Sequence, residues 1–266
     1  SPVCLGSLFT IALLGWVFGA SFSTTAEIFQ GKALKFESGL HFENYAKAWN
    51  GAGVAGFFGN SLIYSVISCT ILILVCAPAA YVLSRFDFIA NKFIQTSFVS
   101  AMGVPAIMVV LPLFSIISGM GILNNVAAGR TVLIILYVGI NVPYTTIFLL
   151  TFFSNISRTY EEAAAIDGAN SFWRFWKIII PMISPTTFFL VIMSTISSLQ
   201  AYDQIQVLTQ GGPAGATRTL LYYYYQEAFR NFNTGKASAV AIVLVLITVV
   251  LSLIETEVSK KTVFYN

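Results

Sequence analysis

The 266-residue chain is poor in charged side chains, histidine and cysteine, and each shortage excludes a class of function. Only 9% of the residues are charged, and the net charge of +3 is spread over many segments, so no nucleic-acid partner is expected. His41 is the single histidine, and Cys4, Cys69 and Cys76 lie in apolar runs without metal-site or disulfide spacing. We therefore expect no metal site, no redox chemistry and no cofactor bound by the chain itself.

What the chain has in excess is apolar residues. They make up 57% of the sequence, and the mean hydropathy is +0.80, which is too apolar for a water-soluble domain of this length. A membrane-spanning helix needs about 20 mostly apolar residues. Six runs approach that length, at residues 3–22, 57–83, 93–117, 131–153, 182–207 and 237–256. The sequence predicts an all-α membrane protein, a polytopic bundle of about six transmembrane helices in one domain over residues 1–266.

Two of these runs have special features. The first also fits a secretory signal peptide, but no convincing small-residue cleavage site follows it and five more runs come after, which favours a membrane span. No initiator Met and no basic leader precede Val3, so we expect the natural chain to begin further upstream. The third run contains Pro105 and Pro112, two breaks that would let its helix bend; packing kinks between helices are the alternative.

The distribution of lysine and arginine predicts the orientation. With six spans, seven of these cations fall on each side of the membrane. One set lies in the shorter segments 84–92, 154–181 and the tail after 257, and short loops carry most weight in the positive-inside rule. The loop 154–181 and the C-terminus are therefore predicted to be cytoplasmic.

That loop holds an unusual segment, TYEEAAAIDGAN, at residues 159–170. Its charges exclude it from the bilayer, because each would cost roughly 3 kcal/mol at the bilayer centre. Thr159 and Glu162 have the spacing of a capping box, and Gly168 stands where a helix would end. The result is a helix of about two turns, which is marginal alone and favours a surface to dock against. An ordinary interfacial loop with a capped turn is the alternative.

The same segment resembles a known family. Glu162-Ala163-Ala164, then Gly168, then Ile178 and Pro181 match the EAA signature of the membrane subunits of bacterial ABC importers, with Ile180 where leucine is usual. The resemblance implies that 154–181 is a coupling loop whose helix docks into an ATP-hydrolysing subunit. The residues that it implies for coupling are Glu161, Glu162, Ala163, Ala164, Asp167 and Gly168.

The rest of the chain is similar to the carbohydrate-uptake branch of that family, the maltose and glycerol-3-phosphate permeases. Segments such as FFGNSLIYS and VLTQGGPAG carry this likeness, mixing features of the two permease types. It implies a permease subunit in a bacterial cell membrane, which carries a sugar or oligosaccharide or, alternatively, a solute such as glycerol phosphate. The implied partners are a second permease subunit, two ATP-binding subunits that hold ATP and Mg²⁺, an extracytoplasmic solute-binding protein and membrane lipid.

Sugar contacts need hydroxyl or amide groups beside aromatic faces. In the fourth run, Tyr137, Asn141 and Tyr144 share one helix face, and the family's sugar-binding subunits are similar around Tyr144. In the fifth run, the candidates are Ser194, Ser197 and Ser198. They are matched to the family's positions by counting from the Gly211-Gly212-Pro213 segment. Ser198 replaces the family's asparagine, and close helix packing is an alternative role for all three serines.

Two other classes of membrane protein are disfavoured. An ion-coupled transporter would place ionisable residues in its spans, and the centres of the six runs hold essentially none. An intramembrane enzyme would need a motif such as H-E-x-x-H, which a chain with a single histidine cannot form. The chain also has no G-x-x-x-x-G-K-[ST] loop with which to bind ATP. We expect a transporter subunit that is not itself an enzyme.

Overall fold

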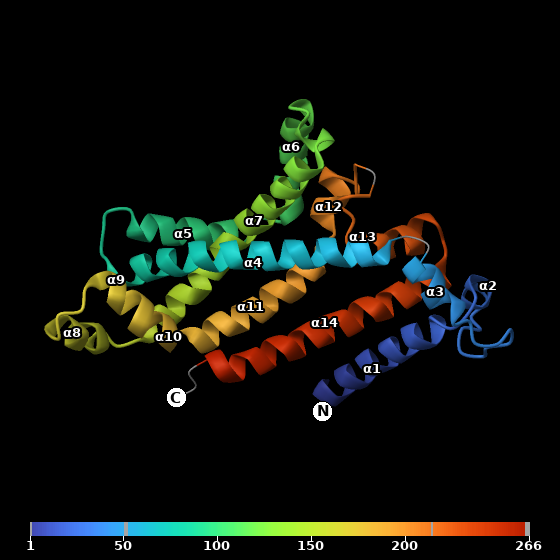
Figure 1. Cartoon of the computed structure of the whole chain (residues 1–266), viewed down its shortest axis with the longest axis horizontal. Helices are drawn as coiled ribbons and strands as arrows, with labels where there is room; N and C mark the ends of the chain where they lie inside the picture. The colour runs from blue at the N-terminus through green and yellow to red at the C-terminus, as the bar shows by residue number, and fades with distance from the viewer. Residues whose placement is uncertain (1, 51–52, 214, 264–266) are drawn as a thin grey trace. The chain divides into compact units, whose positions relative to one another are not determined.

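A computed structural model describes residues 2–50, 53–213 and 215–263, and every regular element within these ranges is a helix. The chain forms two compact units: residues 1–63 with 199–251, and residues 64–198 with 252–266. Helix α4 (Val54–Arg85) and helix α14 (Thr234–Thr262) each contribute residues to both (Figure 1). The all-α fold predicted from composition is confirmed.

The unit of residues 64–198 and 252–266 carries the long helix α7 (Val126–Asn155) and the helices around it. These are α5 (Asn91–Ala101), α6 (Ala106–Gly119), the 3-10 turn η1 (Ile122–Asn124), α8 (Thr159–Ile166), α9 (Ser171–Arg174), the π-helix η2 (Phe175–Ile179), α10 (Ile180–Met182) and α11 (Ser184–Leu199). Its core is aliphatic and aromatic, and it joins α4, α7, η2 and α11 through Leu72, Leu149, Phe153, Ile179 and Leu190. The ends of α4 and α7 thereby place the loop 154–181 beside Arg85.

The unit of residues 1–63 and 199–251 combines the first helices of the chain with its late ones. Its elements are α1 (Pro2–Ala20), α2 (Thr25–Phe29), α3 (Glu43–Asn50), α12 (Asp203–Leu208), α13 (Leu220–Tyr225) and the π-helix η3 (Gln226–Arg230), with parts of α4 and α14. Phe57, Leu220, Tyr223 and Val240 are the main members of its core. Many large apolar side chains of α1, such as Leu8 and Phe9, are exposed, as expected for a surface that faces lipid.

The number of spans agrees only roughly with the six predicted. Three helices, α4, α7 and α14, are long and apolar enough to cross a membrane, and five spans result if each of two bent helix pairs counts as one. The described apolar part of α1, Gly6–Ala20, is shorter than this limit. The run 182–207 is interrupted between the end of α11 at Leu199 and the start of α12 at Asp203. The segment Ser184–Leu208 that contains this interruption is bent by 69° from the preceding segment, Ser171–Met182.

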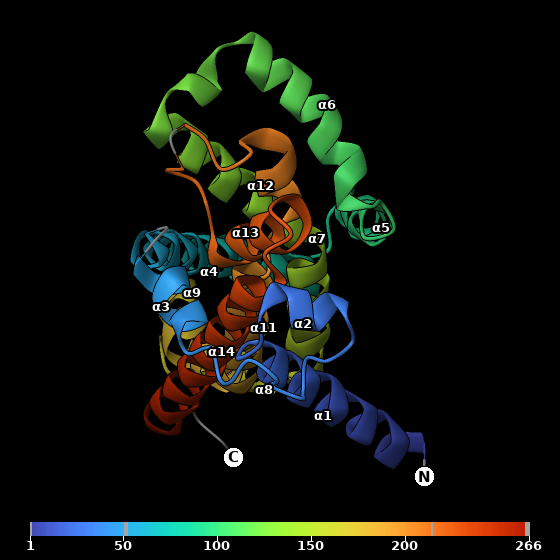
Figure 2. The same cartoon turned by 90° about the vertical axis from the view of Figure 1, so that its right-hand side faces the viewer.

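The run 93–117 is broken as its prolines suggested. Helices α5 and α6 meet at an angle of 93°, and Pro105 is the N-cap residue of α6 (Figure 2). Pro112 lies within α6, which remains one helix. A proline is well suited to the start of a helix, because it has no N–H to leave unpaired there.

Candidate functional site

Helix α8 has the two turns expected from the sequence, but its ends are built differently from each other. The predicted capping box between Thr159 and Glu162 is wrong: Arg158 is the N-cap residue without a side-chain cap, and the Thr159 hydroxyl lies 2.8 Å from the Ser157 hydroxyl. The C-terminal end follows the prediction. Gly168 has a φ of +85°, its N–H donates to the Ala165 carbonyl at 3.0 Å, and the chain leaves the helix there.

The first glutamate of α8 points into the protein. The Glu161 side chain is 12% exposed, and its Oε1 lies 2.7 Å from Nε of Arg85, the last residue of α4, which is 7% exposed. The hydroxyl of Tyr81, one turn earlier in α4, donates to Oε2 at 2.6 Å. Both carboxylate oxygens are thus engaged by one end of α4. A buried carboxylate needs this kind of pairing, since its charge would otherwise be costly.

Arginines extend this cluster to the rest of the loop. Arg174 of α9 donates from Nη1 to the Glu161 carbonyl at 3.1 Å, and Arg158 donates from Nη2 to the Arg85 carbonyl at 3.2 Å. Arg85 itself donates from Nη2 to the Ile156 carbonyl at 3.0 Å, just after α7. Four segments, α4, α7, α8 and α9, are therefore tied to one another by charge-assisted hydrogen bonds.

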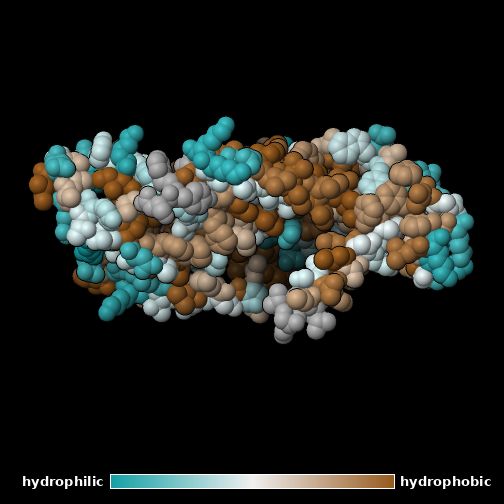
Figure 3. Space-filling model, turned by 90° about the horizontal axis from the view of Figure 1, so that it is seen from below, coloured by the Kyte–Doolittle hydropathy of each residue, from teal (hydrophilic) through white to brown (hydrophobic). Residues whose placement is uncertain are grey.

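The opposite side of α8 is open. Glu162, Ala163, Asp167 and Gly168 are exposed, Ala164 is half-buried, and the apolar Ile166 is 86% exposed. In Figure 3, hydrophilic side chains gather around this segment, at the left end of the view. Beside it lies an open hollow of about 520 Å³, lined by Ala164, Asp167, Gly168, Ala169, Asn170, Trp173 and Ile178. The sequence grouped Glu161 with the exposed coupling residues, whereas the structure separates it from them.

The candidate substrate residues are brought together only in part. Tyr137 is buried, and its hydroxyl donates to the Ser194 carbonyl at 2.9 Å, which joins α7 to α11. The amide of Asn141 donates back to the Tyr137 carbonyl at 2.7 Å, within its own helix. Tyr144 is 44% exposed and stacks on Phe148 at 5.8 Å between ring centroids. On α11, Ser197 is exposed and Ser198 is buried.

One polar contact in the membrane helices was not expected from the sequence. The hydroxyl of Thr195 in α11 donates to Oε1 of Glu255 in α14 at 2.7 Å, and Cys69 Sγ lies 4.0 Å from the same hydroxyl. Cys69 is the midpoint of the 32-residue α4, so the Glu255 carboxyl lies level with the middle of a membrane helix. The sequence placed Glu255 at the edge of the run 237–256, and the only signal for it was an acidic residue inside that run.

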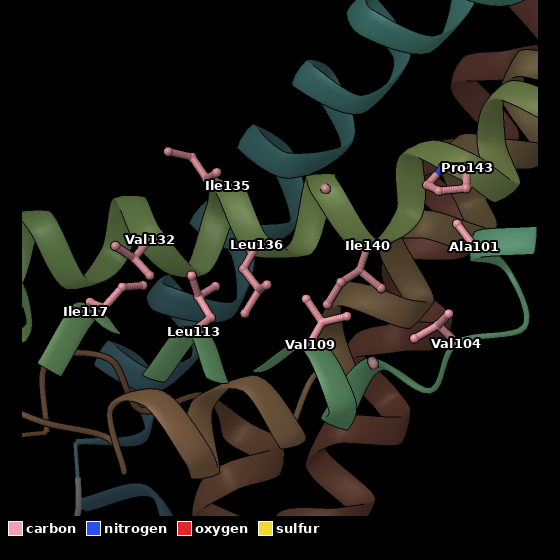
Figure 4. Close-up of a pocket in the computed structure, with 12 residues that line it drawn as sticks. Ala101, Val104, Val109, Leu113, Ile117, Val132, Ile135, Leu136, Ile140 and Pro143 are labelled. Carbon is pink, nitrogen blue, oxygen red and sulfur yellow. The ribbon is translucent and has the colours of Figure 1, made fainter. Parts of the chain in front are cut away.

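A second hollow lies between α5, α6 and α7 and is almost entirely apolar. It measures about 470 Å³, and its lining includes Val104, Val109, Leu113, Leu136 and Ile140 (Figure 4). The side chains from α6 and α7 face each other across it. Its lining offers no hydrogen-bonding side chain to a sugar.

A family model matches most of the chain. The model described as "Binding-protein-dependent transport system inner membrane component" matches residues 70–263. That range includes α7, the loop 154–181, α11 and the second half of α4.

Characterised relatives agree with the family model. The chain is 34% identical over 181 residues to the diacetylchitobiose uptake system permease protein NgcG of Streptomyces coelicolor, covering 68% of this chain and 58% of that protein. It is 36% identical over 126 residues to the sn-glycerol-3-phosphate transport system permease protein UgpA of Brucella abortus, covering 47% of this chain and 43% of that protein. These matches span about half of the relatives' length.

Solved structures share the fold. A bacterial ABC transporter involved in the import of the acidic polysaccharide alginate has a chain that superposes with a TM-score of 0.72 at 22% identity, covering 98% of this chain and 94% of that one. A chain of the methionine ABC transporter MetNI in an inward-facing conformation gives a TM-score of 0.59 at 17% identity, over 80% and 95% of the two chains.

Proposed function

Because the chain belongs to the family of binding-protein-dependent transport system inner membrane components, and is a multi-pass membrane protein, we propose that it is the permease subunit of an ATP-driven ABC importer. The observation that carries the proposal is α8: a two-turn helix anchored on one side and exposed on the other, where Glu162, Ala163 and Ile166 are free to meet another surface. Such a helix suits docking to an ATPase, because its small side chains allow close approach and its glutamate can bind a cation.

In this proposal the chain hydrolyses no ATP. Two partner subunits bind ATP and Mg²⁺, and their closure moves α8 and, with it, the helices of the transport path. The coupling residues are Glu162, Ala163, Ala164, Asp167 and Gly168, and the loop 154–181 and the C-terminus are cytoplasmic. A second permease subunit completes the path, and an extracytoplasmic binding protein delivers the solute.

The proposed solute is a sugar or oligosaccharide. NgcG is named for diacetylchitobiose uptake, and the fold neighbour imports alginate. Tyr137, Asn141, Tyr144, Ser194, Ser197 and Ser198 are candidates for the path, since tyrosine rings and hydroxyls match the faces and edges of sugars. Glycerol phosphate is the second candidate, favoured by the likeness to UgpA.

The test is purification of the assembled complex in mild detergent, identification of the co-purifying chains, and reconstitution in vesicles with the binding protein. We expect ATP-dependent uptake of a saccharide, and a Glu162→Gln variant should lose most of it while remaining in the membrane. A Lys260→Gln variant serves as the matched control, because Lys260 is exposed and pairs with Glu257 three residues earlier on α14. Full coupling in the Glu162 variant would refute the role of α8.

A further inference from the structure

The two adjacent glutamates of α8 have opposite surroundings. Glu161 is enclosed by Arg85, Tyr81 and Arg174, whereas Glu162 is exposed. Successive residues of a helix point about 100° apart, so one of two neighbouring side chains can face inward while the other faces out.

From this difference we infer that Glu161 is a positioning residue: its ion pair with Arg85 fixes α8 to the end of α4, so that a displacement of α8 is transmitted to α4 directly. The inference rests on the proposed coupling function and deepens it. Without the pair, α8 would keep the backbone on either side and two neutral or backbone bonds, from the Tyr81 hydroxyl to the Glu161 carboxylate and from Arg174 to the Glu161 carbonyl. A loop of that kind could yield when it is pushed, because an eight-residue helix has little stability of its own.

The geometry favours a rigid connection. Arg85 uses Nε for Glu161 and Nη2 for the Ile156 carbonyl, while Tyr81 holds the second carboxylate oxygen. From α4, the Tyr81 hydroxyl thus holds one carboxylate oxygen by a hydrogen bond, and the Arg85 guanidinium holds the other by an ion pair. Both partners of the ion pair are nearly buried, so water competes little for these bonds.

Helix α4 leads from this anchor to the candidate transport path. Cys69 lies 16 residues before Arg85 in the same helix, about 24 Å along its axis. At that level the Cys69 sulfur lies beside the hydroxyl of Thr195 in α11. The residue before Thr195 is Ser194, and its carbonyl accepts the hydrogen bond from the Tyr137 hydroxyl of α7. A movement of α4 therefore reaches the contact between α7 and α11 without passing through the backbone of the loop 154–181.

The experiment compares three charge-neutralising variants of the full chain in membranes: Glu161→Gln, Arg85→Gln and the matched control Glu162→Gln. Hydrogen exchange is measured on the peptide that contains residues 159–166. We expect exchange to rise about ten-fold or more in the first two variants, because each breaks a nearly buried ion pair and leaves one partner behind, and to stay at the wild-type level in the control. The double variant Arg85→Gln/Glu161→Gln should raise exchange by less than the product of the two single effects, since both single variants remove the same ion pair.

The second readout is transport per ATP hydrolysed in the reconstituted complex. Glu161→Gln should lower this ratio while the ATPase subunits stay bound, and Glu162→Gln should instead weaken their binding. Should Glu161→Gln fail to reach the membrane, Tyr81→Phe removes a single bond to the carboxylate and should give a smaller change of the same sign. The inference is overturned if the Glu161 and Glu162 variants change exchange equally, or if the Glu161 variant keeps the wild-type ratio.

Failure of the inference can be told apart from failure of the proposed function. If ATPase subunits give no protection to α8 in the wild-type complex, α8 is not the coupling element. The exchange difference between the Glu161 and Glu162 variants, measured without those subunits, still decides whether Arg85 anchors the helix.

Discussion

A glycine at position 168 has two possible reasons, a left-handed backbone conformation and close approach by a partner, and the structure allows them to be tested separately. Its φ of +85° lies in the left-handed region, and no atom of the described residues lies within 4 Å of the position that a Cβ would occupy. A side chain therefore fits within this chain, and the cost of Gly168→Ala comes from the backbone alone. For an L-residue in this region that cost is about 1–2 kcal/mol, a factor of roughly 5–30 in the equilibrium between ordered and frayed α8.

Asparagine provides the matched comparison. It is larger than alanine but enters the left-handed region more readily. If backbone conformation matters, Gly168→Ala should raise hydrogen exchange at residues 164–169 of the isolated chain more than Gly168→Asn does. If close approach by a partner matters, Gly168→Asn should lower ATP-dependent uptake by the assembled complex more than Gly168→Ala does. The reason is that the partner would fill the open hollow beside Gly168, where asparagine takes up more space than alanine.

The assays are hydrogen exchange in membranes for the first effect and ATP-dependent uptake in vesicles for the second. The backbone argument fails if alanine leaves exchange at the wild-type rate or if asparagine raises it more than alanine in the isolated chain.

Three further predictions concern other parts of the molecule. Tyr137→Phe removes the hydrogen bond to the Ser194 carbonyl and should cost about 1 kcal/mol of stability in a thermal unfolding assay in detergent, so an unchanged midpoint would contradict that bond. Tyr144→Ala should leave the midpoint nearly unchanged, because the ring is 44% exposed, yet reduce sugar uptake or alter its specificity; identical kinetics for all sugars would remove Tyr144 from the path. Backbone N–H groups of Thr24 and Ser38, with their hydroxyls, lower the pKa of Glu27 from 4.5 to about 2. A carboxyl group whose pKa is lower in the folded than in the unfolded chain stabilises the fold at pH values above its unfolded pKa. Order in this loop should therefore be lost as the pH falls from about 4.5 toward 2. Hydrogen exchange of Glu27→Gln should lack this pH dependence.

Several features of this protein follow from the sequence alone. Composition fixed the membrane environment, since a chain with so many apolar residues cannot cover itself with polar surface. Helix α8 was also predictable, because its charges, its alanines and Gly168 act within a few residues of one another. The break near Pro105 has the same local origin. The number of spans was less certain, since the apolar runs alone do not show the bend between Met182 and Ser184 or the interruption at 200–202.

Tertiary structure alone decided which way the glutamates of α8 point. Glu161 and Glu162 have the same chemistry and adjacent positions, so no local rule distinguishes them; Arg85 and Tyr81, far away in the sequence, select Glu161 as the inner one. Long-range packing likewise brought the Glu255 carboxyl level with the middle of α4. The physical reason is common to both: local propensity depends on near neighbours, whereas a buried polar group is satisfied by whichever partner the packed helices bring within reach.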